Sequence, residues 1–140
     1  AADAQHLAAE FTGRFKFDRK PLDAHALHVN TSSITAVGND YGFEQVFARG
    51  IRAHGRAGDV LISISTSGRS HNIVLAMEAA RELGIKNIAL TGAEGRAMGE
   101  LADVLLNVPS VETPRIQEMH IFLGHTLCEI VESALCATDC

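Results

Sequence analysis

The sequence predicts an α/β fold, built on a parallel β-sheet within one domain. Three short apolar segments have the length and composition of buried strands: residues 59–65, 86–92 and 102–109. Helical or turn-rich segments at 70–84 and 93–101 lie between them. This alternation of strand and helix is typical of a parallel sheet with right-handed crossovers. Because the chain has 140 residues, we expect residues 1–140 to form a single domain.

The N-terminal part of the chain predicts a helix, a loop and a short strand. Residues 1–12 place Leu7 and Phe11 on one side of a helix. The charged segment that follows contains Pro21 and is expected to form an exposed loop. Residues 24–29 are then a candidate for a short strand.

Two helical segments are expected before the first central strand. Residues 31–37 begin with helix-capping hydroxyl groups, and Gly38-Asn39-Asp40 is a turn signal that should end this segment. Residues 42–55 carry apolar side chains at steps of three and four, which predicts an amphipathic helix.

The C-terminal segment predicts one long helix from Pro114 to about Leu135. Proline suits the first turn of a helix, where its missing N–H costs no hydrogen bond. Apolar side chains recur along the segment at helical spacing: Ile116, Met119, Leu123, Leu127, Ile130, Val131, Ala134 and Leu135. So broad an apolar stripe is typical of a helix packed on a core.

Composition argues against several classes of function. Twelve basic and seventeen acidic residues give a formal charge of −5, whereas a nucleic-acid binder needs a basic surface. Aromatic residues make up 5% of the chain, too few for base-stacking platforms. No apolar run has the roughly 18 to 20 residues that span a membrane. The three cysteines lie near the C-terminus at spacings that fit no disulfide framework, which indicates a reducing compartment.

A hydroxyl-rich segment, STSGRS, lies between the strand at 59–65 and the helix that follows. In open parallel sheets ligands bind at this place, where helix N-termini present unpaired N–H groups to anions. Four side chains could add neutral hydrogen-bond donors: Ser65, Thr66, Ser67 and Ser70. A phosphomonoester is the anion that such a loop would hold. The alternative is that Ser70 only caps the helix and the other hydroxyls satisfy a turn.

Two helices carry polar side chains of matching chemistry. His6 and Glu10 are four residues apart and therefore share one helix face. Gln117 and His125 are eight apart, which offsets them by about 80° and roughly 12 Å along a helix axis. Imidazole combined with carboxylate or amide suits a divalent metal or an acid–base couple. Taken alone, each pair is weak evidence, because a lone histidine–glutamate pair at this spacing is more often a solvated or satisfied surface pair.

In combination and order, four motifs resemble the phosphoheptose isomerases of the sugar-isomerase (SIS) fold: AADAQHLAAEFTGR, VGND, STSGRS and RIQEMHIFLGH. The resemblance covers nearly the whole chain. It implies a three-layer parallel-sheet sandwich, flavodoxin-like and free of nucleotide. It also implies a cytoplasmic homotetramer, with sites near subunit interfaces, that binds neither nucleic acid nor membrane. Its expected reaction converts D-sedoheptulose 7-phosphate to D-glycero-D-manno-heptose 7-phosphate through an enediol, the first step of nucleotide-activated heptose synthesis.

The resemblance assigns roles to residues of this chain. Glu10 matches the base that forms the enediol, and His125 matches its acid–base partner. Seven positions match residues that bind the substrate: Asn39, Asp40, Ser65, Thr66, Ser67, Ser70 and Gln117. A zinc site present in some members matches His6, Glu10, Gln117 and His125. His120 matches no ligand of the family and is expected to be structural.

Two features of the sequence qualify the resemblance. The glycine-rich loop and the helix that precede the family's first motif are not present before Ala1, and we expect them in the full gene product. The 12 Å offset of Gln117 from His125 is long for two ligands of one metal, so one ligand could come from a neighbouring subunit. Two alternatives remain open: a non-catalytic SIS scaffold that binds the replication initiator, and a phosphosugar-sensing domain.

Overall fold

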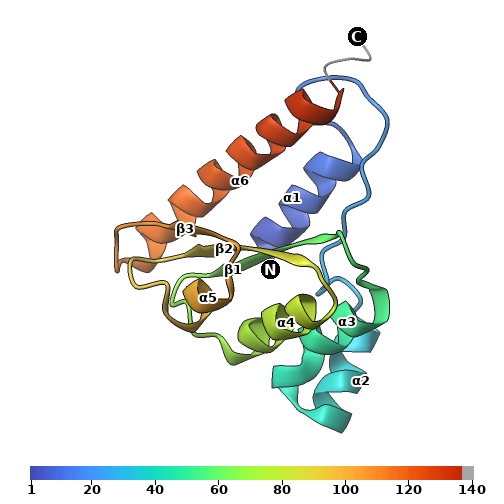
Figure 1. The fold of residues 1–140 in the computed structure, drawn as a ribbon, viewed down its shortest axis with the longest axis vertical. Helices are drawn as coiled ribbons and strands as arrows, with labels where there is room; N and C mark the ends of the chain where they lie inside the picture. Colours follow the sequence, from blue (N-terminus) through green and yellow to red (C-terminus); the bar gives the residue numbers. More distant parts are fainter. Residues whose placement is uncertain (137–140) are drawn as a thin grey trace.

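A computed structural model describes residues 1–136 and places a three-stranded parallel sheet at the centre of the molecule (Figure 1). The strands lie side by side in chain order: β1 (Val60–Ser65), β2 (Lys86–Thr91) and β3 (Val104–Asn107). β1 and β2 pair along their full length, so that Val60 is opposite Lys86 and Ser65 is opposite Thr91. All three strands fall within the segments predicted from the sequence.

Helices cover both faces of the sheet, as Figure 1 shows. One face carries α2 (Thr31–Tyr41), α3 (Val46–His54), α4 (His71–Glu82) and α5 (Arg96–Leu101), with the short 3₁₀ turn η1 (Phe43–Gln45) before α3. The other face carries α1 (Ala2–Thr12) and α6 (Thr113–Cys136). The structure is therefore the predicted three-layer α/β sandwich.

The crossover helix α4 is packed between α3 and the sheet. Ala76, Ala79 and Ala80 are fully buried, and with Met77 they form the buried residues of the helix. The alanines form one cluster with Ala48 and Ile51 of α3, and Met77 packs with Ala89 of β2. This packing holds the N-terminus of α4 against the end of β1.

The helices α1 and α6 run parallel and lie unusually close together. A Cβ atom added to Gly124 on α6 would lie 2.7 Å from Cδ2 of Leu7, a distance that packed atoms do not adopt. Leu7 itself is buried, so the contact is part of the core. Because glycine permits this approach, polar side chains that flank the contact on the two helices reach one another.

A buried carboxylate ties the loop after α1 to the end of α6. Glu132 is 1% exposed and accepts hydrogen bonds from three consecutive backbone N–H groups, those of Phe15, Lys16 and Phe17. The Nε of Arg19 lies 2.9 Å from the same carboxylate. The Arg19 guanidinium also donates to the carbonyl oxygens of Glu10 and Phe11 in the last turns of α1. This arrangement fixes the end of α1 relative to α6.

Two details of the sequence prediction are wrong. The segment 24–29 forms no strand: the N–H of Val29 donates to the carbonyl of Ala26 in a turn, and Leu27 packs against the core beside α3. The predicted turn at residues 38–40 is helical instead. α2 continues to Tyr41 and ends at Gly42, which has a φ of +90°, so this glycine stops the helix four residues later than the turn signal at Gly38 indicated.

Among the described residues, no helix combines the length and the hydropathy that crossing a lipid bilayer requires.

Candidate active site

The hydroxyl-rich loop begins where β1 ends and leads into α4. The Oγ of Ser65, the last residue of β1, lies 2.8 Å from the Oγ of Ser70 and 3.4 Å from the Oγ of Ser67. Ser70 is the N-cap residue of α4, but its side chain makes no capping hydrogen bond in the described chain. Its hydroxyl turns towards the loop instead of the helix, so capping does not account for it. The first N–H groups of α4 therefore face the same space as the serine hydroxyls.

Glycines hold the loop in this shape. Gly68 has a φ of +64°, and a Cβ atom added there would lie 2.4 Å from the carbonyl oxygen of Gly95. The carbonyl of Thr66 accepts a hydrogen bond from the N–H of Gly92. A second glycine-containing loop, residues 92–95, thus packs against residues 65–70, which we call the hydroxyl loop. A side chain at residue 68 would push the two loops apart.

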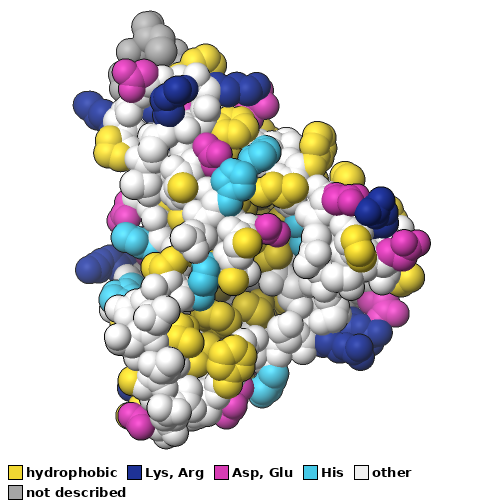
Figure 2. Space-filling model, turned by 180° about the vertical axis from the view of Figure 1, so that it is seen from behind, with side chains coloured by type: hydrophobic (Ala, Val, Ile, Leu, Met, Phe, Trp, Pro, Cys, Tyr) yellow, Lys and Arg dark blue, Asp and Glu magenta, His cyan; other side chains and the backbone are white. Residues whose placement is uncertain are grey.

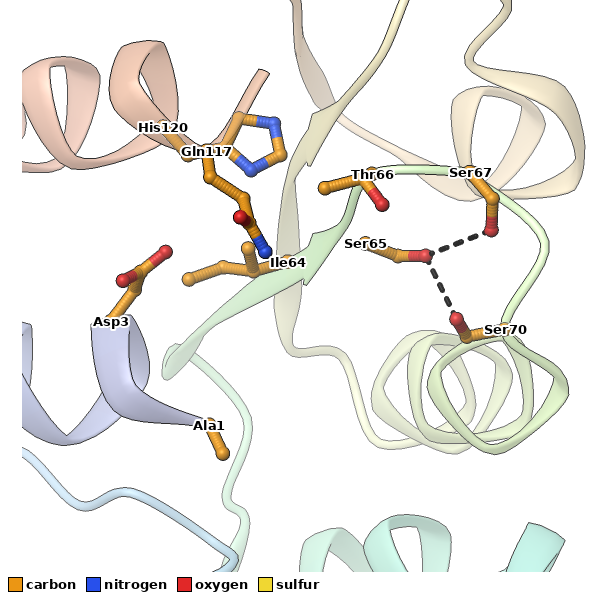
Figure 3. Close-up of a pocket in the computed structure, with 9 residues that line it drawn as sticks. All are labelled: Ala1, Asp3, Ile64, Ser65, Thr66, Ser67, Ser70, Gln117 and His120. Carbon is orange, nitrogen blue, oxygen red and sulfur yellow. Dashed lines mark hydrogen bonds between the residues drawn. The ribbon is translucent and has the colours of Figure 1, made fainter. Parts of the chain in front are cut away.

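A pocket opens beside this loop, between β1, α1 and α6 (Figure 3). Its lining combines the loop hydroxyls with polar side chains from both helices of the opposite layer, and consists of Ala1, Asp3, Ile64, Ser65, Thr66, Ser67, Ser70, Gln117 and His120. Figure 3 shows Gln117 and His120 on the α6 side and Asp3 on the α1 side. The pocket thus offers neutral donors at one end and a carboxylate, an amide and an imidazole at the other.

A second polar cluster lies further along α1 and α6. The Nε2 of His6 lies 3.0 Å from the Oε1 of Glu10 and 3.4 Å from the Nε2 of His125. The two imidazole rings meet edge to face, with centroids 5.0 Å apart. Potential ligand atoms of these three residues all lie within 4.8 Å of one another. The prediction that the first and last helices bring His6, Glu10 and His125 close together agrees with these distances.

The donor set of this cluster fits a divalent metal. Two imidazole nitrogens and one carboxylate oxygen are the ligands of many catalytic zinc sites, which leave a further position open. Two nitrogens that each lie about 2.05 Å from a tetrahedral zinc ion are about 3.3 Å apart, and the two Nε2 atoms here are 3.4 Å apart. Moreover, the Nε2 of His6 has one hydrogen-bonding position for two close neighbours. A shared cation would satisfy all three groups at once.

The remaining predicted site residues lie elsewhere. Gln117 lines the pocket of the hydroxyl loop, about two turns of α6 before His125. Asn39 and Asp40 are exposed in the last turn of α2, and they are not part of the pocket lining within the described chain. The structure therefore groups the predicted residues into the three-residue cluster, the loop with Gln117, and an exposed pair.

The sequence alone does not identify Asp3 and His120 as residues of the pocket. Asp3 precedes His6 by three residues, so helical spacing alone would place both on neighbouring turns of one face. His120 follows Gln117 by the same interval, but a histidine on an apolar helix is commonly a core residue. Its position on the pocket wall appears only when α6 is placed against the end of β2.

A thiol close to the cluster is kept protonated. Burial raises the pKa of Cys128 to about 11, and the negative charge of Glu10 acts in the same direction. Nucleophilic attack needs the thiolate, so the free Cys128 thiol is unreactive at neutral pH. It behaves as a small apolar residue between α1 and α6.

Comparison with known proteins gives consistent matches. The family model of the SIS domain matches residues 1–92. The chain is 58% identical over 137 residues to the phosphoheptose isomerase of Rhodospirillum rubrum, covering 98% of this chain and 73% of that protein. It is 57% identical over 132 residues to the phosphoheptose isomerase of Akkermansia muciniphila, covering 94% of this chain and 70% of that protein.

Solved structures agree with the sequence matches. The phosphoheptose isomerase GmhA of Neisseria gonorrhoeae superposes with a TM-score of 0.88 at 52% identity, covering 94% of this chain and 70% of that one. A phosphoheptose isomerase of Francisella tularensis gives a TM-score of 0.90 at 43% identity, covering 94% of this chain and 71% of that one. At these identities, the likeness covers the sequence as well as the fold.

Proposed function

The chain belongs to the phosphoheptose isomerase family of SIS-domain proteins, and on that basis we propose that it converts D-sedoheptulose 7-phosphate to D-glycero-D-manno-heptose 7-phosphate. The reaction is an aldose–ketose isomerisation through an enediol. It would supply the first intermediate of nucleotide-activated heptose synthesis. The observation that carries the proposal is the convergence of an acid from α1 and an imidazole from α6 on one point, about two helical turns from Asp3 and Gln117, which line the pocket of the hydroxyl loop.

The isomerisation moves a proton between C1 and C2 of the sugar. A base must take the proton from one carbon, and an acid must exchange protons between the two oxygens. We assign the first role to the carboxylate of Glu10 and the second to the imidazole of His125. Both side chains are partly exposed to solvent, so a substrate can reach them.

The phosphate of the substrate would bind the hydroxyl loop. Asp3 at the pocket and Glu10 at the cluster are seven residues apart on α1, about 10 Å along the helix. A seven-carbon sugar phosphate that extends from the hydroxyl loop past Asp3 would direct its reacting end towards Glu10. Phosphate binding by Ser65, Thr66, Ser67 and Ser70 would then orient the reacting end of the sugar. The amide of Gln117, on the pocket wall, would bind the chain between the two ends.

Loss of one loop hydroxyl tests the phosphate assignment. Ser70→Ala removes a hydroxyl that points into the loop and makes no capping bond. We expect the KM for the sugar phosphate to rise about tenfold with a small change in kcat, because the reacting groups lie elsewhere. Ser33→Ala, on exposed α2, is the control and should behave as wild type. An unchanged KM in Ser70→Ala would remove this hydroxyl from the binding site.

We propose that the cluster holds one zinc ion per subunit through His6, Glu10 and His125. When bound, zinc would act as a Lewis acid on the oxygens of the reacting carbons. Gln117 was also assigned to the metal by family resemblance, and a movement of its side chain or a ligand from another subunit would be needed to complete that set. Glu10 would have to loosen from the ion when it acts as a base.

Removal of the metal is expected to abolish turnover reversibly. Dialysis against a chelator should reduce activity by at least tenfold, and added Zn²⁺ should restore it, with one zinc per subunit by elemental analysis. His6→Ala should lose the zinc, whereas His25→Ala, which alters an exposed loop histidine, should keep it. Full activity in demonstrably metal-free protein would refute a catalytic zinc.

We also infer a cytoplasmic homotetramer with sites near the subunit interfaces. Support comes from the outer face of α6, where Met119, Phe122 and Ile130 are exposed large apolar residues at helical spacing. Figure 2 shows hydrophobic side chains exposed on one face of the molecule, next to histidines. Light scattering on the purified protein measures the mass directly, and a monomer at micromolar concentration would contradict the inference.

Turnover of sedoheptulose 7-phosphate, followed by NMR of the product, tests the function itself. A phosphosugar sensor would bind the compound without converting it, and a scaffold for the replication initiator would capture that protein without needing the acid–base pair. Conversion to the heptose 7-phosphate separates the isomerase from both alternatives. Bound but unconverted substrate would refute the proposal.

A further inference from the structure

One buried histidine of the pocket has a ring nitrogen without a partner. His120 is 1% exposed, and its Nε2 lies 3.1 Å from the carbonyl oxygen of Thr91 at the end of β2. Its Nδ1 is buried and has no hydrogen-bond partner in the described chain. A buried polar atom in this state is costly, so its retention requires an explanation.

The contact with Thr91 decides what this nitrogen can do. A backbone carbonyl oxygen only accepts hydrogen bonds, so the proton of the neutral ring must be on Nε2. The Nδ1 atom then carries a lone pair and is an acceptor. The ring cannot turn over without losing the bond to Thr91, since its position is fixed by burial between α6 and the sheet.

The position of the ring points to a ligand in the pocket. His120 and Gln117 both belong to the pocket lining, and Figure 3 shows them together on the α6 wall, across from the hydroxyl loop. A dianionic phosphate needs donors, and a lone pair would repel it. The group that suits Nδ1 is therefore a hydroxyl, which can donate. A sugar chain anchored by its phosphate at the hydroxyl loop brings hydroxyls to this wall.

We propose that His120 is a substrate-binding and specificity-determining residue, whose Nδ1 accepts a hydrogen bond from a hydroxyl in the middle of the sugar chain. This inference rests on the proposed isomerase function and adds a recognition element to it. Substrates that lack that hydroxyl would leave the acceptor unpaired and be rejected, in the way that sites built for a hydroxyl discriminate against deoxy analogues.

Two substitutions test the roles of the two ring nitrogens of His120 one at a time. His120→Gln places an amide N–H near Nε2, which keeps the bond to Thr91 and removes the acceptor in the pocket. His120→Asn places an amide oxygen near Nδ1, which keeps the acceptor and loses the bond to Thr91. We expect His120→Gln to lower kcat/KM for sedoheptulose 7-phosphate about tenfold, mainly through KM, and His120→Asn to stay within about threefold of wild type.

Monodeoxy analogues of the substrate identify the hydroxyl. One analogue lacks the hydroxyl that donates to Nδ1. For that analogue, wild type and His120→Gln should have the same kcat/KM, because removing the acceptor has no further effect when the donor is already absent. A His120→Gln variant with wild-type kinetics, or a His120→Asn variant as impaired as His120→Gln, would overturn the inference and leave a structural role. Absence of turnover by the wild type would instead refute the proposed function.

A measurement on the wild-type protein does not depend on how the variants fold. Histidine labelled with ¹⁵N should show His120 Nδ1 as an unprotonated ring nitrogen that shifts upfield when the sugar phosphate binds, while Nε2 keeps its proton. An Nδ1 resonance that saturating sugar phosphate leaves unchanged would overturn the inference.

Discussion

Glu10→Gln is expected to abolish isomerisation while the sugar phosphate still binds. The amide keeps the size of the side chain but cannot accept a proton from carbon, and a positioned base of this kind contributes about 10²- to 10⁴-fold to the rate. The hydroxyl loop belongs to a separate segment between β1 and α4, and its pocket meets α1 at Asp3, about two turns before Glu10, so the substitution does not alter it. The loss should therefore appear in kcat, with the affinity for substrate changed little.

The measurement compares turnover with binding in the same variant. Product formation is followed by NMR and affinity by calorimetry, and the zinc content is checked so that loss of metal is not mistaken for loss of the base. Glu82→Gln is a suitable control, because this residue pairs with Arg52 on an exposed surface of α4. If Glu10→Gln turned over substrate at the wild-type rate, Glu10 would have no part in proton transfer.

Glu132→Gln is expected to destabilise the protein strongly. The carboxylate accepts bonds from three backbone N–H groups and from Arg19 in a site that water does not reach. A neutral amide leaves the Arg19 charge uncompensated and turns an N–H group towards other donors. We expect the Tm to fall by about 10 °C, as measured by calorimetry at neutral pH.

The same site predicts how stability depends on pH. Burial alone would raise the pKa of Glu132, but the N–H groups of Lys16, Phe15 and Phe17 and the Arg19 side chain outweigh it and hold the pKa below its usual value. A depressed pKa in the folded state means that the stabilisation is fully present above the unfolded-state pKa and is lost as pH falls through the folded-state pKa. The Tm difference between wild type and Glu132→Gln should therefore shrink in acid.

A neighbouring glutamate gives the matched control. Glu129 lies one turn earlier on α6 and pairs with Lys16 while half of its side chain is exposed. Exposed ion pairs contribute little, so Glu129→Gln should shift the Tm by no more than about 2 °C. Equal losses in the two variants would show that the buried geometry at Glu132 has no special effect.

Most of the fold follows from patterns that are local in the sequence. Apolar runs of six or seven residues, separated by a periodic helix, predict both the strands and their parallel pairing. Residues 24–29 show the limit of such reasoning, because a short apolar segment packs equally well as a turn or as a strand. The sequence also signals a stop at Gly38, whereas α2 continues until Gly42, where the backbone becomes left-handed.

The site is predictable where helical spacing decides it. His6 and Glu10 meet because they are four residues apart, and His125 joins them because α1 and α6 pack in parallel. The separation of Gln117 from His125 likewise follows from the rise of the helix. His120 is not predictable in this way, since its role depends on which strand lies opposite α6 and on a carbonyl that fixes its tautomer.

The contact between Gly124 and Leu7 sets the distance between α1 and α6, and the proposed reacting side chains lie on these two helices. The proposed base Glu10 and its partner His125 are on different helices, and the backbone of Gly124 packs directly against Leu7 between them. A methyl group at residue 124 would push the helices apart and separate the two side chains without changing either of them. Under the proposed mechanism, a substitution at Gly124 is therefore expected to lower activity although the residue has no side chain to bind the sugar.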